Sequence, residues 1–183
     1  MAVKTFAVGE VLTASDTNTY LANAGLVYIT STTVGSGVSS VTVSNCFSST
    51  YDNYRIVYTG GTQSSNTQTA LRLGSSTTGY SGSIQYVIYT GGAAPAQASD
   101  NNGDKFTWAG GGDSISVIVV CDLFGPYATA HTRIAVPNVT YSILAGTYAG
   151  IHGVSTSYTG FTILPGSGTL TGGTITVYGY RKA

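Results

Sequence analysis

Side chains that could carry out catalysis are scarce in this chain of 183 residues, which has two histidines and only seven acidic residues. His131 and His152 have no cysteine or carboxylate beside them in the sequence, so a structural or surface role is favoured over a catalytic one. No segment has the G-x-S-x-G pattern of a serine hydrolase. No glycine run is followed by the Lys-Ser or Lys-Thr of a phosphate-binding loop. The sequence therefore gives little support to an enzymatic function.

Paired carboxylates are the one enzymatic alternative that stays open. Glycoside hydrolysis needs two carboxyl groups roughly 5 to 9.5 Å apart, and Asp52, Asp113 and Asp122 are the candidates for such a depolymerase. Their spacing in the sequence does not show that they meet. The 14 tyrosines and Trp108 are candidates for a sugar-stacking platform, although most of these rings are expected in the core.

A metal site and a disulfide are two further alternatives. Asp100 and Asp104 enclose a run of hard oxygen ligands that could hold calcium, but the spacing departs from that of an EF-hand, and a plain solvated turn is favoured. Cys46 and Cys121 each have apolar neighbours, so we expect two buried thiols, with a disulfide as the minor alternative. Two cysteines without a nearby histidine cannot form an ordinary zinc site. We expect no cofactor.

Composition excludes several classes of protein. Only 8% of the residues are charged and the formal net charge is zero, so the clustered basic residues of a nucleic-acid binder are missing. A hydrophobic content of 42% argues against disorder. Residues 115–121 form the longest β-rich apolar stretch, which is too short for membrane insertion. The first ten residues lack a signal-peptide core, and we therefore expect synthesis in the cytoplasm.

The first 25 residues differ from the rest and are expected to form a docking arm with a short helix. Thr13 and Asp16 have the spacing of a capping box, and apolar residues then follow at helical spacing until Gly25. A helix this short is marginal alone, so its apolar side must pack against a partner. The residues expected to dock or assemble are Val11, Leu12, Tyr20 and Leu21.

Residues 26–183 have the pattern of an all-β domain. Short β-rich segments alternate with Gly, Ser, Asn and Pro, which predicts an antiparallel sandwich or barrel. Residues 114–122 are expected to form a central strand covered on both faces. Turns are expected at the glycine runs 60–61, 91–92, 110–112 and 172–173 and at residues 165–166. Strands are predicted at 26–32, 38–44, 54–59, 69–73, 84–90, 105–109, 114–122, 132–137, 139–144, 148–154, 160–164 and 174–180.

Two parts of the chain resemble virion proteins of tailed bacteriophages. The opening, residues 5–6 and 9–16 continuing through 18–21, is similar to the start of many small tail-fibre or minor-tail proteins. Residues 47–57 and the ending at 172–181 are similar to segments of jelly-roll-like modules in phage appendages. The resemblance implies a jelly-roll-like β-sandwich, a homotrimer and a location in the virion.

The resemblance leaves two positions on the particle open. The first is an outward-facing trimeric appendage that is anchored by the arm to other virion proteins and attaches to host-surface glycans or proteins. The alternative is a capsid decoration or head-fibre protein that stabilises the shell. A nearly neutral, hydroxyl-rich surface suits a protein that assembles. Residues 60–68 and 91–104 are expected to be long loops and are the candidates for host contact.

Overall fold

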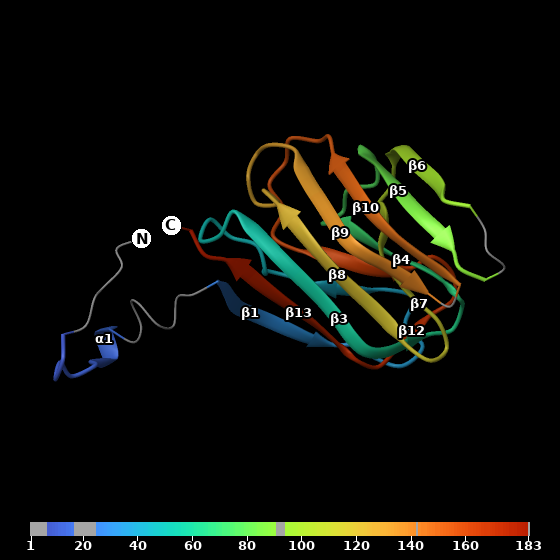
Figure 1. Cartoon of the computed structure of the whole chain (residues 1–183). Coiled ribbons are helices and arrows are strands. Elements are labelled where there is room, and N and C mark those ends of the chain that lie inside the picture. Colours follow the sequence, from blue (N-terminus) through green and yellow to red (C-terminus); the bar gives the residue numbers. More distant parts are fainter. Residues whose placement is uncertain (1–6, 17–24, 91–93, 142, 183) are drawn as a thin grey trace.

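The structure is a computed structural model that describes residues 7–16, 25–90, 94–141 and 143–182. Within these ranges it is almost entirely β-structure with antiparallel pairing, as predicted (Figure 1). The elements in chain order are α1 (Ala14–Asp16), β1 (Leu26–Thr33), β2 (Val41–Val43), β3 (Asn53–Gln63), β4 (Thr67–Leu73), β5 (Tyr80–Ile88), β6 (Ala96–Gly103), β7 (Phe106–Gly112), β8 (Val117–Phe124), β9 (Thr132–Tyr141), β10 (Leu144–His152), β11 (Phe161–Pro165), β12 (Leu170–Thr171) and β13 (Thr174–Tyr180).

Eight of the strands form a jelly roll. One layer has the order β1-β13-β3-β8 and the other has the order β2-β11-β4-β7. Along the chain these strands move back and forth between the layers, which is the connectivity of a jelly roll. The expected jelly-roll-like antiparallel β-sandwich is therefore confirmed. The two layers stay linked by hydrogen bonds, because Gly110–Gly112 at the end of β7 pair with the start of β8.

Two inserted hairpins enlarge the first layer. The β5–β6 pair is inserted between β4 and β7, and the β9–β10 pair between β8 and β11. Strand β9 pairs with β8 and β10 pairs with β5, so the layer becomes an eight-stranded sheet ordered β1-β13-β3-β8-β9-β10-β5-β6. We call this layer the large sheet. It lies in front in Figure 1, with β4 and β7 behind it.

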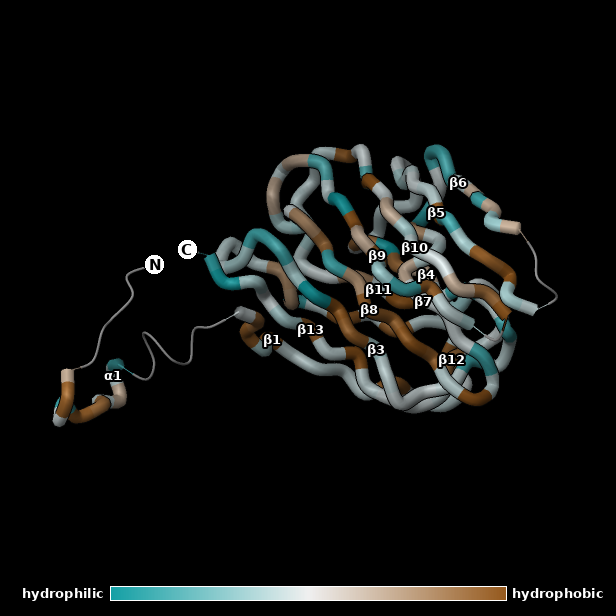
Figure 2. Tube along the Cα trace, in the orientation of Figure 1, coloured by the Kyte–Doolittle hydropathy of each residue, from teal (hydrophilic) through white to brown (hydrophobic). Residues whose placement is uncertain are grey.

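A single hydrophobic core fills the space between the layers. Alternate residues of β3, including Tyr54 and Ile56, are fully buried, and Figure 2 shows the apolar residues concentrated along the middle strands. Aromatic rings join the layers: Tyr80 packs edge-on against Phe106 at 4.9 Å. Burying one such side chain contributes about 1.5–3 kcal/mol, so the core stabilises the sandwich strongly.

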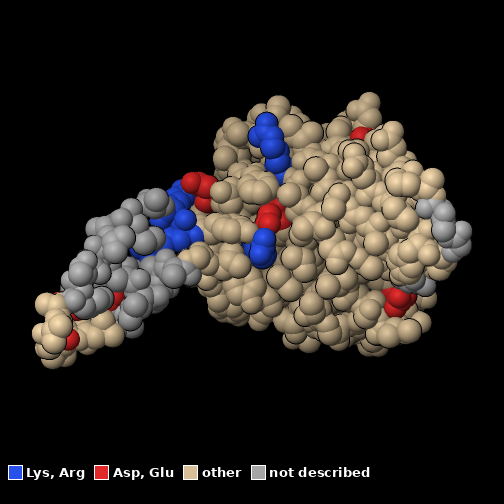
Figure 3. Space-filling view, in the orientation of Figure 1, with Lys and Arg blue, Asp and Glu red and all other residues tan. Residues whose placement is uncertain are grey.

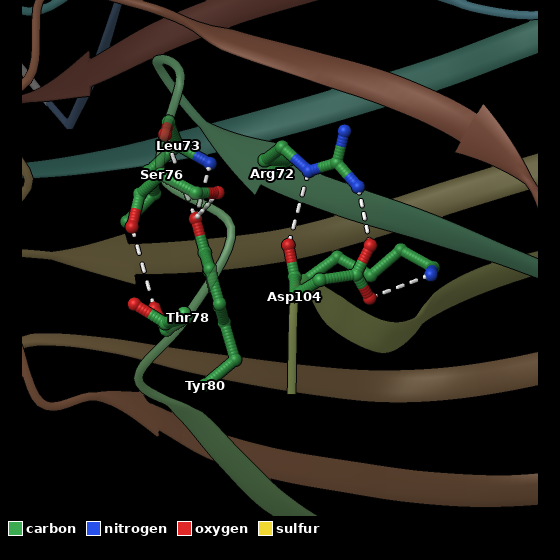
Figure 4. A network of polar contacts seen from close by, with 7 residues as sticks. Arg72, Leu73, Ser76, Thr78, Tyr80 and Asp104 are labelled. Carbon is green, nitrogen blue, oxygen red and sulfur yellow. Dashed lines mark hydrogen bonds and ion pairs between the residues drawn. The ribbon is translucent and has the colours of Figure 1, made fainter. Parts of the chain in front are cut away.

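Three fully buried tyrosines, Tyr54, Tyr58 and Tyr80, keep their hydroxyl groups hydrogen-bonded, whereas the buried hydroxyl of Tyr148 has no partner among the described residues. The Tyr54 hydroxyl donates to the carbonyl of Ser48 at 2.8 Å, and the Tyr58 hydroxyl donates to the carbonyl of Gly172 at 2.9 Å. The Tyr80 hydroxyl accepts the amide of Leu73 at 2.8 Å (Figure 4). Each of these three rings therefore contributes apolar area without leaving a buried polar atom unpaired.

Strand β8 is central, as predicted, because it pairs with β3, β7 and β9. The prediction that both of its faces are covered is wrong. Val119, Cys121 and Leu123 are buried, whereas Ile118 and Val120 on the opposite face are only half-buried. The core covers one side of the large sheet and leaves the other side as an outer face.

Several predicted boundaries are wrong. Residues 96–103 form strand β6, although a loop was predicted there. Residues 60–63 continue strand β3, although a loop was predicted to begin at residue 60. Residues 132–141 form the single strand β9 where two strands were expected. Gly110–Gly112 belong to β7 instead of a turn, whereas Gly172 and Gly173, with positive φ values, form the expected turn before β13. Cys46 and Cys121 are buried free thiols, as predicted.

The start of the predicted helix lies within the described residues. Its described part, α1, covers Ala14–Asp16 and has the predicted capping box: the Asp16 amide donates to the Thr13 hydroxyl at 3.1 Å, and the Thr13 amide donates to the Asp16 carboxylate at 3.1 Å. The remainder of the predicted helix, residues 17–24, lies outside the described residues.

Candidate binding face

The outer face of the large sheet carries one row of side chains that crosses all eight strands. Each residue of this row lies opposite the next one on the neighbouring strand, and paired residues of antiparallel strands project from the same face. The row is Tyr28, Tyr178, Arg55, Asp122, Ala135, Ala149, Ser83 and Ser99. It changes from aromatic to charged to small residues from β1 to β6.

Three hollows meet on the half of this face formed by β9, β10, β5 and β6. Their volumes are about 620, 430 and 280 Å³. Gln85 and Thr147 line the first two, and Gln97 lines the first and the third. We call the combined depression the outer groove, defined by Ala135, Thr147, Ala149, Ser83, Gln85 and Gln97.

A second row of residues provides the polar groups of the outer groove. Thr147 lies opposite Gln85, and Gln85 lies opposite Gln97. Within the part of the chain that the structure describes, no hydrogen bond engages the side chains of Gln85 and Gln97. Each amide presents two donor hydrogens and an acceptor oxygen, so this row can bind groups that both donate and accept.

A charged cluster closes the groove on the β8 side. The Arg55 guanidinium donates to both carboxylate oxygens of Asp122 at 2.8 and 2.7 Å, and the Tyr180 hydroxyl donates to Asp122 at 2.6 Å. Burial alone would raise the pKa of Asp122, but these hydrogen bonds outweigh it and the pKa is lowered. Burial and the bond to Asp122 raise the pKa of Tyr180 to about 12. The cluster is therefore internally neutralised at neutral pH.

Charge is unevenly distributed over this side of the molecule. Figure 3 shows basic and acidic atoms toward the β3 side and a mainly uncharged surface over β10, β5 and β6. Among the lining residues of the three hollows, only Arg55 and Asp122 are charged, and they pair with each other. The groove surface is therefore polar without a net charge.

Asp113 and Asp122 lie too far apart to form a glycosidase pair. Asp113 accepts the amides of Ile115 and Ser116 in the turn before β8, whereas Asp122 is the sixth residue of that strand. The strand rise alone separates Val117 from Asp122 by about 16 Å, beyond the carboxyl separation of glycoside hydrolases.

Asp52 and Asp122 are also engaged in other contacts. Asp52 forms an ion pair with Lys182 at 2.7 Å. Asp122 is stabilised in its ionised form by Arg55 and Tyr180, whereas the general acid of a glycosidase needs a raised pKa. The described residues thus place each candidate carboxylate in a structural contact.

The run between Asp100 and Asp104 takes part in strand pairing. Asn102 accepts the amide of Gly79 at 2.9 Å. Asp104 pairs with Arg72 (Figure 4) and also with Lys105. Hydrogen bonds from Lys105 and Arg72 lower the pKa of Asp104. Among the described residues, no group of three or more His, Cys, Asp or Glu could hold a metal ion.

His152 is fully buried and contacts Ser76, so we ask whether it could act as a base toward the serine hydroxyl. Its Nε2 lies 2.9 Å from the Ser76 hydroxyl and 3.1 Å from the carbonyl of Thr78. A carbonyl only accepts, so Nε2 must carry the proton and cannot remove one from Ser76. Burial lowers the pKa of His152. The histidine therefore stabilises the turn before β5, the structural role that the sequence favoured.

The predicted docking residues are only partly described. Val11 is 78% exposed and Leu12 48% exposed, so both are available to a partner. Tyr20 and Leu21 lie outside the described residues. The predicted contact loops are mostly strands: residues 60–68 belong largely to β3 and β4, and residues 96–103 form β6. Sequence reasoning missed Gln85, Thr147 and Ala149, which occur in ordinary strand patterns.

Comparisons with known proteins found no relative of the chain. No protein-family model, no curated protein and no solved structure matches the chain. In the described ranges, no helix is long and apolar enough to span a membrane.

Proposed function

We propose that the protein is a non-catalytic attachment module of a tailed-phage virion, built as a homotrimer and facing outward. The phage assignment is supported by the resemblance of the N-terminal arm and of residues 47–57 and 172–181 to phage virion proteins. The attachment role is carried by one observation, the broad outer face with its uncharged groove. Its carboxylates are used in structural contacts, so the module binds without turnover.

The arm and the sandwich have separate roles in this proposal. Exposed apolar side chains at Val8, Val11 and Leu12 suit an arm that docks onto other virion proteins. The sandwich then presents its outer face to the host surface. Trimerisation joins three weak sites, and linked sites gain about 10² to 10⁴ in avidity when their geometry permits simultaneous contact.

Localisation on the intact particle by cryo-electron microscopy tests the proposal. We expect density for the sandwich at the tail, with the outer face exposed. Density over the icosahedral shell would instead establish the capsid-decoration alternative. Light scattering should give the mass of a trimer, and a stable monomer at micromolar concentration would contradict the trimeric part.

Truncation tests the role assigned to the arm. Removing residues 1–16 should leave the sandwich folded but prevent its incorporation into particles, because the described core lies in residues 34–177. Incorporation at the wild-type level would contradict docking through Val11 and Leu12, because Tyr20 and Leu21 remain in this variant. The paired substitutions Val11→Ser and Leu12→Ser should have the same effect as the truncation, because they remove exposed apolar area without changing the chain length.

A further inference from the structure

We propose that the outer groove is a binding site for a neutral oligosaccharide that lies across β9, β10, β5 and β6. This inference rests on the attachment function proposed above and identifies the chemical class of the ligand and the residues that bind it. Three features of the groove carry it: its free amide and hydroxyl groups, its floor of small residues and its lack of net charge.

The polar groups of the groove match sugar hydroxyls. A sugar hydroxyl both donates and accepts hydrogen bonds, and the row Thr147, Gln85 and Gln97 offers amide and hydroxyl groups with both capacities. These three residues are exposed and lie on adjacent strands. A chain that crosses the strands would therefore meet a new polar side chain about every 4.8 Å.

The floor of the groove suits the apolar C–H surface of a sugar ring. Ala135, Ala149 and Ser83 lie side by side on β9, β10 and β5, and none of them is long enough to fill the hollow. Pro137 lines the same hollow. A pyranose ring can thus rest on methyl and methylene groups while its hydroxyls reach the neighbouring polar row.

The charge of the groove selects against other ligands. Arg55 and Asp122 neutralise each other at its edge, so an anionic polymer or nucleic acid gains no net attraction. Protein-binding hot spots are rich in Trp, Tyr and Arg. The residues of these types that line the hollows are Arg55, which is paired with Asp122, Tyr148, which is buried, and Tyr86, which is partly buried, so the groove offers no fully exposed aromatic or unpaired arginine as an anchor. A neutral glycan is the ligand that the groove chemistry favours.

The test is binding of the full-length protein to immobilised oligosaccharides: dextran, mannan, β-glucan and N-acetylglucosamine fragments as neutral probes, with heparin and polysialic acid as anionic probes. We expect binding to at least one neutral probe and to neither anionic one. Ala149→Trp should weaken this binding at least tenfold because the indole occupies the groove. Gln85→Ala combined with Gln97→Ala should also weaken it, by removing hydrogen bonds while leaving the floor intact.

A control variant separates the groove from the rest of the sheet. Thr33 is exposed on β1 at the opposite edge of the large sheet, so Thr33→Trp adds the same indole and should leave binding unchanged. Circular dichroism must show that every variant is folded. Binding only to anionic probes, no binding to any neutral probe, or full binding by Ala149→Trp would each overturn the proposal. Loss of the oligomer on Ala149→Trp would also overturn it, because the groove would then be an interface between copies.

A failure of the glycan-site proposal can be distinguished from a failure of the proposed attachment function. If the protein lies at the tail surface but binds no neutral probe, the glycan site is wrong and attachment stands. If the groove binds a neutral probe but the protein covers the capsid shell, the site is correct and the attachment role is wrong.

Discussion

Arg55 on β3 and Asp122 on β8 lie directly opposite each other, and the guanidinium of Arg55 donates hydrogen bonds to both carboxylate oxygens. Tyr180 on β13 donates to the same carboxylate. The Asp122 carboxylate therefore links three neighbouring strands on the outer face, β8, β3 and β13. It also marks the boundary between the charged part of that face and the uncharged groove.

Removal of this carboxylate is the first test. Asp122→Ala should lower the free energy of unfolding by about 1.5–3 kcal/mol, because hydrogen bonds to a charged group are lost in a partly buried place. Urea unfolding measures the change. Asp52→Ala, whose pair with Lys182 is more exposed, should cost no more than about 1 kcal/mol. Equal losses in the two variants would contradict the assigned importance of Asp122.

A second prediction concerns pH. The pKa of buried His152 is lowered from its usual 6.5, so its contribution to stability is fully present above about pH 6.5 and is lost as the pH falls toward the folded-state pKa. Unfolding midpoints measured from pH 7.5 to 5 should therefore fall with pH. His152→Gln should remove most of this slope, whereas His131→Gln should retain most of it. An unchanged slope in His152→Gln would exclude His152 as its source.

The third prediction distinguishes two glycines. A Cβ on Gly111 would lie 2.5 Å from the carbonyl oxygen of Thr140, which is closer than two such atoms can approach. The clash arises because β7 packs tightly against β9 at this point. Gly111→Ala should therefore destabilise the protein by about 1–3 kcal/mol in thermal unfolding. Gly153→Ala meets nothing nearer than 3.7 Å and should be tolerated. If both variants melted like the wild type, the close packing of β7 would be wrong.

Thiol reactivity provides a fourth test. Burial raises the pKa of Cys46 to about 12 and raises that of Cys121 further, and a thiolate is the reactive form. The native protein at pH 8 should therefore react with Ellman's reagent far more slowly than the unfolded protein, in which two thiols should react. Rapid reaction of the native chain would contradict the burial of both cysteines.

The sequence determined the class of fold by itself. Alternation such as that of Tyr54, Ile56 and Tyr58 is a local property with a period of two, so it marks a strand with one buried face regardless of its partners. The apolar run within residues 114–122 likewise predicted a central strand, which is observed as β8. Free buried cysteines followed from their apolar neighbours.

Only the tertiary structure decided which strands pair and therefore what lies on the outer face. A glycine run is compatible with a turn or with close packing, and the approach of Thr140 to Gly111 made residues 110–112 part of a strand. Residues 96–103 are polar because they form an edge strand with little buried surface, which resembles a loop in sequence. The outer groove depends on registers that join Ala135 to Ala149 and Gln85 to Gln97, and such long-range pairings leave no mark in the local pattern.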